Sequence, residues 1–309
     1  MRVIKPGLLT TVQDHGRWGF QSRGVPVAGP MDAYAHRLAN ALAGNQAGAA
    51  TLEITLIGPE LEFDDDRIIA VTGANFELTV SDHPMPAQTA FAVRRASRLK
   101  FGRRLGGARA YLAVGGGVAV APVLGSRATH VTTAMGGVEG RALKAGDRLP
   151  LGPEARRAKA GVTGGQVALP NGPARLRVLP GPHADYFSDA SLRVLQAALY
   201  TIDQQSDRMG FRLDGDAIPY ASADLISDAT PMGTVQILRS GLPLLLMADR
   251  QTTGGYPQLA IVIAADLPIA GQLAPGDTVS FALCSAADAM AALIAQERTL
   301  MTIEGRESA

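Results

Sequence analysis

Cysteine is almost absent from this sequence: Cys284 is the single one among 309 residues. One thiol cannot form an intrachain disulfide, so we expect a protein of a reducing compartment, the cytoplasm. Long apolar runs are also lacking, since the longest, such as Leu242–Ala248, are far too short to cross a bilayer. The first twenty residues contain no apolar core of the kind that secretory signal peptides carry.

The sequence has no excess of charge of either sign. Lysine and arginine total 29 residues against 28 aspartates and glutamates, which gives a net charge of +1. Proteins that work on nucleic acid or on membrane surfaces carry a basic surface, so this balance argues against either as the main role. The hydrophobic content of 47% is sufficient for an ordinary packed core.

Common nucleotide and catalytic motifs are missing as well. The sequence contains no GxxxxGK[ST] loop and no GxSxG elbow, and Gly115-Gly116-Gly117 does not continue as GxGxxG. Five histidines without paired ligand spacing and one cysteine argue against a structural zinc site, and we expect no metal site in the chain itself. If ATP is used, another type of site or another chain must hold it.

Short apolar runs bounded by glycine and proline dominate the sequence, and they predict a mainly β, barrel-like fold. The expected strands include Leu61–Phe63, Ile68–Thr72, Phe91–Val93, Tyr111–Val114, Val235–Leu238 and Thr278–Leu283. Helices are few. Those that we expect span Met31–Ala43, Ser191–Tyr200 and Ala286–Leu300.

Three short internal repeats predict two related halves. Arg2–Gly7 resembles Arg177–Gly181, Asp14–Phe20 resembles Asp207–Arg212, and GPMD at 29–32 resembles TPMG at 230–233, all in the same order. We therefore predict an N-terminal half over residues 1–160, a C-terminal half over 172–290, and a helix with a tail over 291–309. The division falls in the polar stretch 152–172. Related halves commonly form a site between them.

Two dense polar segments are candidate sites. The loop from Asp249 to Tyr256 joins two apolar runs and contains opposite charges, hydroxyl groups and a glycine pair that permits positive φ and a close backbone approach. Its candidate binding residues are Arg250, Gln251, Thr252, Thr253, Gly254, Gly255 and Tyr256. A wide hairpin loop closed by a local Asp249–Arg250 pair is the alternative interpretation.

Further candidates lie outside this loop. Arg208 and Arg212 are spaced to reach the same side of a strand and to hold a carboxylate or phosphate. Gln236 is a further candidate for substrate binding. Among N-terminal residues, Gln13 suits an amide or carboxylate, and Asp14 and Arg17 either bind substrate or form a local ion pair.

Asp32 stands in the first turn of an expected helix. It is either a carboxylate directed into the site or a residue that interacts with the helix dipole. We predict catalytic roles for Asp32 and Asp249, and the general base stays open among these two and Asp228.

These segments resemble a known family: the biotin-dependent carboxyltransferase-like proteins that include the C subunit of bacterial 5-oxoprolinase. The resemblance covers residues 10–257 in family order, and Ser227-Asp228-Ala229 departs from the usual Ser-Glu-Gly. The stretches that carry it are TTVQDHGRWGFQSRGVPVAGPMD, HRLANALAGN, LEITLIGPELEF, YLAVGGGVAVAPVLGSRAT, RVLPGPHADYF, SDRMGFRLDG and MADRQTTGGYP.

The resemblance implies two cyclophilin-like β-barrel domains related by duplication. It also implies a direct partner, the 5-oxoprolinase B subunit, together with a separate A subunit. The complex opens 5-oxoproline to glutamate with ATP hydrolysis, with Mg²⁺ accompanying ATP. The chain has no Met-Lys-Met site, so we expect no covalent biotin on it.

Other functions stay open at this point. One is carboxyl transfer from carboxybiotin to urea or a related amide, which needs a biotin carrier on another protein. Another is a non-enzymatic regulator that binds a kinase inhibitor. Prolyl isomerisation would follow from the barrel alone, and fold alone does not assign a function.

Overall fold

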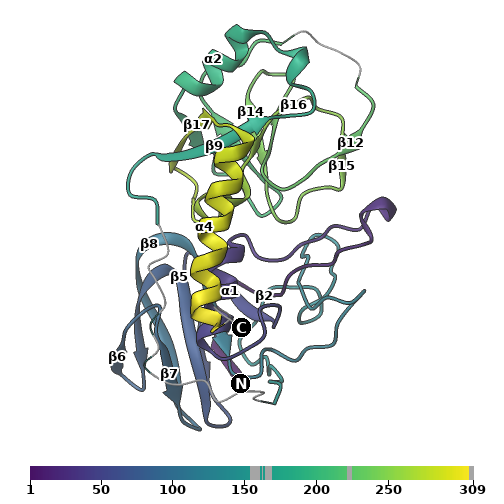
Figure 1. Cartoon of the computed structure of the whole chain (residues 1–309). Coiled ribbons are helices and arrows are strands. Elements are labelled where there is room, and N and C mark those ends of the chain that lie inside the picture. The colour runs from purple at the N-terminus through teal and green to yellow at the C-terminus, as the bar shows by residue number, and fades with distance from the viewer. Residues whose placement is uncertain (154–160, 162, 164–168, 221–224, 306–309) are drawn as a thin grey trace. The chain divides into compact units, whose positions relative to one another are not determined.

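The structure is a computed structural model that describes residues 1–153, 161, 163, 169–220 and 225–305, and it separates into two compact units (Figure 1). Unit 1 consists of Met1–Arg17, Ala28–Leu169 and Glu297–Ala309, and unit 2 of Trp18–Val27 and Pro170–Gln296. The stretch 152–172, where we expected the division, lies partly outside the described residues, as does the end of the tail, 306–309.

Unit 1 is an antiparallel half-barrel of eight strands within the described residues. The strands run in the order β1-β4-β8-β3-β2, and β5 also pairs with β6, β7 and β8. Their bounds are β1 Arg2–Lys5, β2 Leu9–Gln13, β3 Thr51–Thr55, β4 Glu60–Glu62, β5 Arg67–Val80, β6 His83–Met85, β7 Ala90–Val93 and β8 Arg98–Val114.

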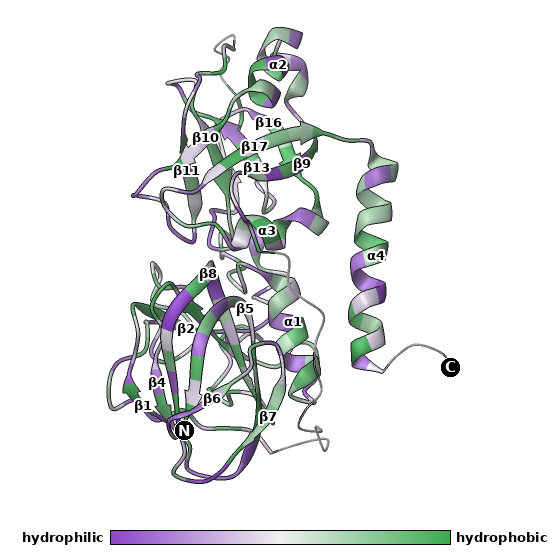
Figure 2. Ribbon diagram, turned by 90° about the vertical axis from the view of Figure 1, so that its left-hand side faces the viewer, coloured by the Kyte–Doolittle hydropathy of each residue, from purple (hydrophilic) through white to green (hydrophobic). Residues whose placement is uncertain are grey.

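Two long strands, β5 and β8, form the centre of unit 1. Alternate residues of a strand point to opposite faces, so Ile69 packs in the main hydrophobic core while its neighbour Ala70 packs against helix α1 (Ala33–Leu42). In β8, likewise, Leu112 packs in the main hydrophobic core and Ala113 packs against α1. The first ten residues of β8 mix exposed and buried positions, whereas the last seven, 108–114, are all buried; hydrophilic and hydrophobic positions both occur in this sheet (Figure 2).

Unit 2 is a closed barrel with the strand order β10-β11-β14-β13-β16-β9-β17. All its pairs are antiparallel except β9 with β17, the first and last strands of the unit, which run parallel. A separate two-stranded ribbon, β12 with β15, completes the unit. The bounds are β9 Ala174–Pro180, β10 Tyr200–Ile202, β11 Gly210–Asp214, β12 Asp228–Ala229, β13 Thr234–Ile237, β14 Pro243–Leu246, β15 Thr253–Gly254, β16 Gln258–Val262 and β17 Thr278–Leu283.

Helices are few, as the sequence predicts, and the mainly β prediction is confirmed. Besides α1, the described α-helices are α2 Asp189–Ala197, α3 Leu267–Gly271 and α4 Ala286–Glu304. Short 3-10 turns span η1 Gln21–Arg23, η2 Ala184–Tyr186 and η3 Ala264–Asp266. None of the helices in the described ranges is both long enough and apolar enough to cross a membrane.

The three internal repeats have different structural outcomes. Gly7 and Gly181 both lie where a Cβ would collide with a neighbouring carbonyl oxygen, of Ile57 and of Gln258. Two aspartates make the same local turn: Asp14 accepts from the backbone N–H of Gly16 (2.9 Å), and Asp207 from that of Met209 (2.7 Å).

The third pair of similar segments, 29–32 and 230–233, does not share a structure. Asp32 caps helix α1, whereas Gly233, its counterpart in the sequence, precedes strand β13.

A buried histidine makes unit 1 sensitive to acid. His36 of α1 is fully buried, with Nδ1 3.0 Å from the Thr51 hydroxyl. Burial lowers its pKa to about 3, and the nearby His15 acts in the same direction. Between pH 6.5 and 3 the unfolded chain therefore binds a proton at this position that the folded chain excludes, so this group lowers the stability as the pH falls.

We predict that His36→Asn flattens the pH dependence of stability. From about pH 6.5 to about pH 4.5, the free energy of unfolding of the unaltered chain should fall by about 2.3 kcal/mol more than that of the variant, since a pH unit contributes about 1.4 kcal/mol well below the unfolded pKa and less close to it. Urea unfolding across this range measures the difference. His83→Asn, at an exposed histidine, is the matched control and should keep the full slope; equal slopes for both variants would contradict the prediction.

Candidate functional site

The polar loop that follows β14 is anchored by a buried ion pair. The Asp249 carboxylate accepts from Arg208 Nε at 2.9 Å and from Nη2 at 2.8 Å, and the Asp249 backbone N–H donates to the Arg208 carbonyl at 2.8 Å. Both side chains are buried. Asp249 is therefore anchored to the segment just before β11, and the alternative of a hairpin loop closed by an Asp249–Arg250 pair does not describe this loop. The catalytic role of Asp249 stays a prediction.

Arg250, the next residue, has neutral partners. Its Nε donates to the Thr230 carbonyl at 2.6 Å and its Nη1 to the Met247 carbonyl at 3.3 Å. Burial lowers the pKa of Arg250 to about 10, against the opposing effect of Asp249. At neutral pH the guanidinium is still charged, so this half-buried cation can bind an anionic ligand group.

The loop folds back onto the segment before β13. In the ribbon, Asp228 of β12 lies opposite Gly254 of β15, and Ala229 opposite Thr253. The Thr230 N–H donates to the Thr252 carbonyl at 3.1 Å, and the Thr230 hydroxyl donates to the Gln251 carbonyl. These bonds fix the backbone around Arg250.

Two buried glutamines hold the ribbon against the barrel. Gln236 of β13 and Gln258 of β16 are register partners, so their side chains leave the same face of the sheet. Gln236 Nε2 donates to the Tyr256 carbonyl (3.4 Å) and Gln258 Nε2 to the Ala229 carbonyl (3.0 Å). Both residues are fully buried, and neither Oε1 atom has a hydrogen-bond partner among the described residues.

The two glycines of the loop have different surroundings. Neither Gly254 nor Gly255 adopts the positive φ that glycine permits. The close approach is confirmed for Gly254, where a Cβ would lie 2.7 Å from Gln236 Nε2. A Cβ on Gly255 would meet nothing nearer than the Ser227 hydroxyl at 3.7 Å. The steric constraint therefore lies on Gly254.

We call Gln236, Gln258, Thr230, Arg250 and Gly254 the amide cluster. The sequence predicted three of these five, and it missed Gln258 and Thr230. A single amide opening the apolar run 258–262, next to a loop of polar residues, was the available signal for Gln258.

The other predicted residues of unit 2 are less enclosed. Gln251 and Thr252 are half-buried, whereas Thr253, Gly255 and Tyr256 are exposed. Arg212 is also exposed, on β11, while Arg208 is buried. The two arginines lie in different environments, with Arg212 on β11 and Arg208 before it, and that they hold one ligand stays a prediction.

The predicted N-terminal residues lie in unit 1. Asp14 accepts from the Ser126 hydroxyl and from the Arg127 backbone N–H, both at 2.5 Å. Arg17 Nε donates to the Val123 carbonyl at 2.9 Å, and its side chain is buried. Both side chains therefore brace the loop that follows β8.

Gln13 repeats the pattern of the two glutamines in unit 2. Its Nε2 donates to the Thr11 hydroxyl and to the Thr129 carbonyl, each at 3.0 Å, while its buried Oε1 has no partner among the described residues. Gln13 and the amide cluster are in separate units, and the prediction that they face one site stays a prediction.

Asp32 is the N-cap of α1, and its carboxylate accepts from the Ala35 N–H at 2.8 Å. Its own N–H donates to the Tyr111 hydroxyl (2.8 Å), which in turn donates to Glu53 (2.7 Å). Burial, followed by the charge of Glu53, raises the pKa of Tyr111 well above its usual value, so the hydroxyl stays protonated. The contacts of Asp32 account for a structural role, and its catalytic role stays a prediction.

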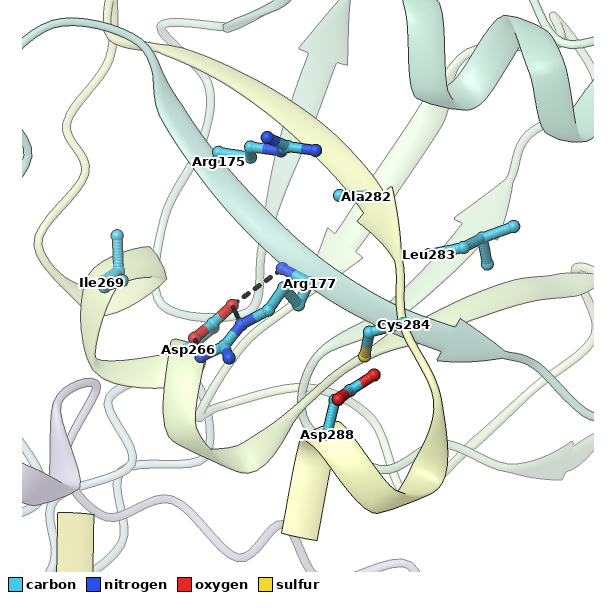
Figure 3. Close-up of a pocket in the computed structure, with 8 residues that line it drawn as sticks. All are labelled: Arg175, Arg177, Asp266, Ile269, Ala282, Leu283, Cys284 and Asp288. Atoms are coloured by element: carbon cyan, nitrogen blue, oxygen red, sulfur yellow. Dashed lines mark hydrogen bonds and ion pairs between the residues drawn. The ribbon is translucent and has the colours of Figure 1, made fainter. Parts of the chain in front are cut away.

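A pocket of about 510 Å³ lies elsewhere in unit 2 (Figure 3). Its lining residues are Arg175, Arg177, Asp266, Ile269, Ala282, Leu283, Cys284 and Asp288. Arg177 donates to Asp266 through Nη2 at 2.6 Å and through Nε at 3.0 Å, so its charge is already compensated. None of the residues predicted to bind substrate is among those described as lining this pocket.

The sequence matches the family model of the carboxyltransferase domain, subdomain A and B, over residues 23–283. The chain therefore belongs to this carboxyltransferase-domain family, which agrees with the resemblance of the motifs. It is 39% identical over 299 residues to the C subunit of 5-oxoprolinase from Escherichia coli, with 96% of each chain covered. It is 36% identical to that of Haemophilus influenzae, covering 90% of this chain and 89% of the relative.

Similarity of structure extends to much longer proteins. The crystal structure of the Kluyveromyces lactis urea carboxylase matches with a TM-score of 0.90 and 32% identity, covering 100% of this chain and 29% of that one. The K. lactis urea amidolyase also gives 0.90, with 98% of this chain and 20% of that chain covered. This chain therefore corresponds to a minor part of either protein.

We predict that Asp249→Asn destabilises unit 2, because it leaves the Arg208 guanidinium buried beside a neutral partner. Breaking a buried ion pair costs about 3–5 kcal/mol, which urea unfolding would detect. Replacing both partners, as in Arg208→Met with Asp249→Leu, should lose less. Asp214→Asn, at an exposed aspartate of β11, is the control and should change stability little. If Asp249→Asn is as stable as the control variant, the ion pair does not anchor the loop.

Proposed function

We propose that this chain is the C subunit of an ATP-dependent 5-oxoprolinase, which converts 5-oxo-L-proline to L-glutamate and is active only together with its A and B subunits. The similarity to two proteins that bear the name of the 5-oxoprolinase C subunit, over 96% and 90% of this chain, carries this proposal. In contrast, the chain covers only 18% of the urea amidolyase of Lachancea kluyveri, at 33% identity.

The chemistry of the amide cluster supports this substrate. 5-Oxoproline presents a lactam N–H, a lactam carbonyl and a carboxylate within one small ring. The cluster offers buried acceptor oxygens on Gln236 and Gln258 and a cation on Arg250. Donor and acceptor types therefore match for the N–H and for the carboxylate.

A lactam is a poor electrophile, and its opening requires activation of the carbonyl oxygen, which ATP would supply. Gln236 and Gln258 present acceptor oxygens, and these do not fit the oxygens of a triphosphate. We therefore assign no step through ATP to this cluster. Within the proposed complex, we expect ATP and its Mg²⁺ to be held by other residues, and those of a partner protein are the first candidates.

The second candidate function is carboxyl transfer to an amide such as urea. The TM-score of 0.90 to the urea carboxylase favours it. The absence of Met-Lys-Met from the sequence requires that the biotin carrier be another protein. The two functions differ in products, because carboxyl transfer consumes carboxybiotin and releases no glutamate.

We predict that glutamate is released from 5-oxoproline and ATP only when this chain is mixed with its candidate A and B subunits. The chain alone, and each mixture that lacks one of the three proteins, are the controls and should release none. Stable complex formation without glutamate release would contradict the proposal and favour carboxyl transfer, to be tested with urea and carboxybiotin.

We further predict that Gly254→Ala lowers the kcat/KM of the complete mixture by about 10-fold or more, since a lost contact of about 1.4 kcal/mol gives this factor. The added methyl group displaces the Gln236 amide, whose Nε2 it would approach to 2.7 Å. Gly255→Ala, whose methyl group would meet only the Ser227 hydroxyl, at 3.7 Å, is the matched control and should stay within about 2-fold of the unaltered chain. Equal activities for the two variants would remove the Gln236 position from the site.

A further inference from the structure

We propose that the amide cluster recognises a small amide that also carries a carboxylate: Gln236 and Gln258 accept the ligand's amide hydrogen through Oε1, and Arg250 binds its carboxylate. The identification of this ligand as 5-oxoproline rests on the proposed function. The recognition chemistry rests on the contacts within unit 2.

The orientation of the two glutamine amides is the first observation. A carboxamide is planar, so anchoring Nε2 fixes where Oε1 lies. Gln236 is anchored through Nε2 to the Tyr256 carbonyl, and Gln258 to the Ala229 carbonyl. A backbone carbonyl can only accept a hydrogen bond, so each of these contacts must use Nε2, the donor of the glutamine amide. The acceptor Oε1 is then left available.

The cost of leaving these acceptors unsatisfied is the second observation. A buried polar atom without a partner is destabilising, and native proteins rarely retain one without a use. Two such atoms occur here, the Oε1 atoms of Gln236 and Gln258, and these two residues lie opposite each other on the neighbouring strands β13 and β16. Both Oε1 atoms require a hydrogen-bond donor, and the single N–H of a lactam, shared between them in a three-centre hydrogen bond, supplies it without introducing a charge.

The charges around the cluster are the third observation. The Asp249 carboxylate is bound to Arg208, and the exposed Asp228 accepts from the Ala229 N–H at 2.6 Å. Arg250 is bound to carbonyls, and among the described residues no carboxylate forms an ion pair with it. A carboxylate on the ligand would compensate this charge, and Arg250 would select ligands that have one.

The lack of a side chain at Gly254 is the fourth observation. Thr230 Cγ2 lies 3.1 Å, and Gln251 Nε2 3.3 Å, from the position that a Cβ on Gly254 would occupy, in addition to the contact with Gln236. Glycine is thus required for the backbone of β15 to lie directly against the Gln236 amide. This packing holds the amide in a single orientation, as selective recognition requires.

The test measures binding to the complex of this chain with its candidate A and B subunits, without ATP, by titration calorimetry. Three probes separate the contacts: 5-oxoproline, the lactone 5-oxotetrahydrofuran-2-carboxylate, which lacks the N–H, and 2-pyrrolidinone, which lacks the carboxylate. We expect the complex to bind 5-oxoproline at least about 10-fold more tightly than either analogue, because each analogue leaves a buried group unpaired.

Variants then assign each contact. Gln236→Met and Gln258→Met keep side-chain size without the acceptor, and each should reduce the preference for lactam over lactone to about 3-fold or less. Arg250→Met should abolish the preference for 5-oxoproline over 2-pyrrolidinone and leave the lactone comparison unchanged. Gln196→Met, at an exposed glutamine of α2, is the control and should behave as the unaltered chain.

The outcomes distinguish this proposal from the proposed function. Equal binding of lactam and lactone by the unaltered complex would overturn the proposal without any variant. Retained selectivity in both folded glutamine variants, with glutamate release intact, would overturn the site and leave the function standing. Binding of urea that Gln236→Met abolishes, in a complex that releases no glutamate, would support amide recognition and overturn the 5-oxoprolinase assignment.

Discussion

The loop of the amide cluster depends on the ion pair between Arg208 and Asp249. The pair combines two side-chain bonds with one backbone bond, so it fixes both the position and the direction of the chain where it leaves β14. Arg250 follows directly and inherits that placement, which lets its guanidinium reach the Thr230 carbonyl. A buried charge pair contributes little net stability but fixes one arrangement among several, and here it determines where the neighbouring cation lies.

Unit 1 shows what the same residue types do when their partners are internal. Polar and charged residues are dense in the N-terminal segment, and for this reason the sequence predicts site roles for Asp14, Arg17 and Asp32. Their contacts are with loop backbone and with a helix end. The contacts of Asp14 and Asp32 are complete within the fold and suffice to explain why those residues are there. Gln13 differs, because its Nε2 is hydrogen-bonded whereas its Oε1 has no partner among the described residues. The unpartnered Oε1, and not charge density, is what distinguishes Gln13 from Asp14 and Asp32.

Much of the fold could be predicted from the sequence, since apolar alternation and turn residues act locally. The expected strand Thr278–Leu283 and the helix starting near Asp32 are both present. The site was only partly predictable, because its key facts are contacts between distant segments. Adjacency in the sequence suggested that Asp249 pairs with Arg250, whereas the partner is Arg208, which lies just before β11. Likewise, only packing distinguishes Gly254 from Gly255.

The parallel pairing of β9 with β17 has a consequence for how unit 2 forms. β9 is the first strand of the barrel and β17 the last, and β17 also pairs with β10, so the ring stays open until this final strand arrives. During synthesis, every strand of the barrel must leave the ribosome before the edges of β9 and β10 are covered. Closure of such a distant contact is slow and leaves strand edges exposed in the meantime. Nascent chains that are cut short before residue 278 should therefore be prone to aggregation and depend on chaperones.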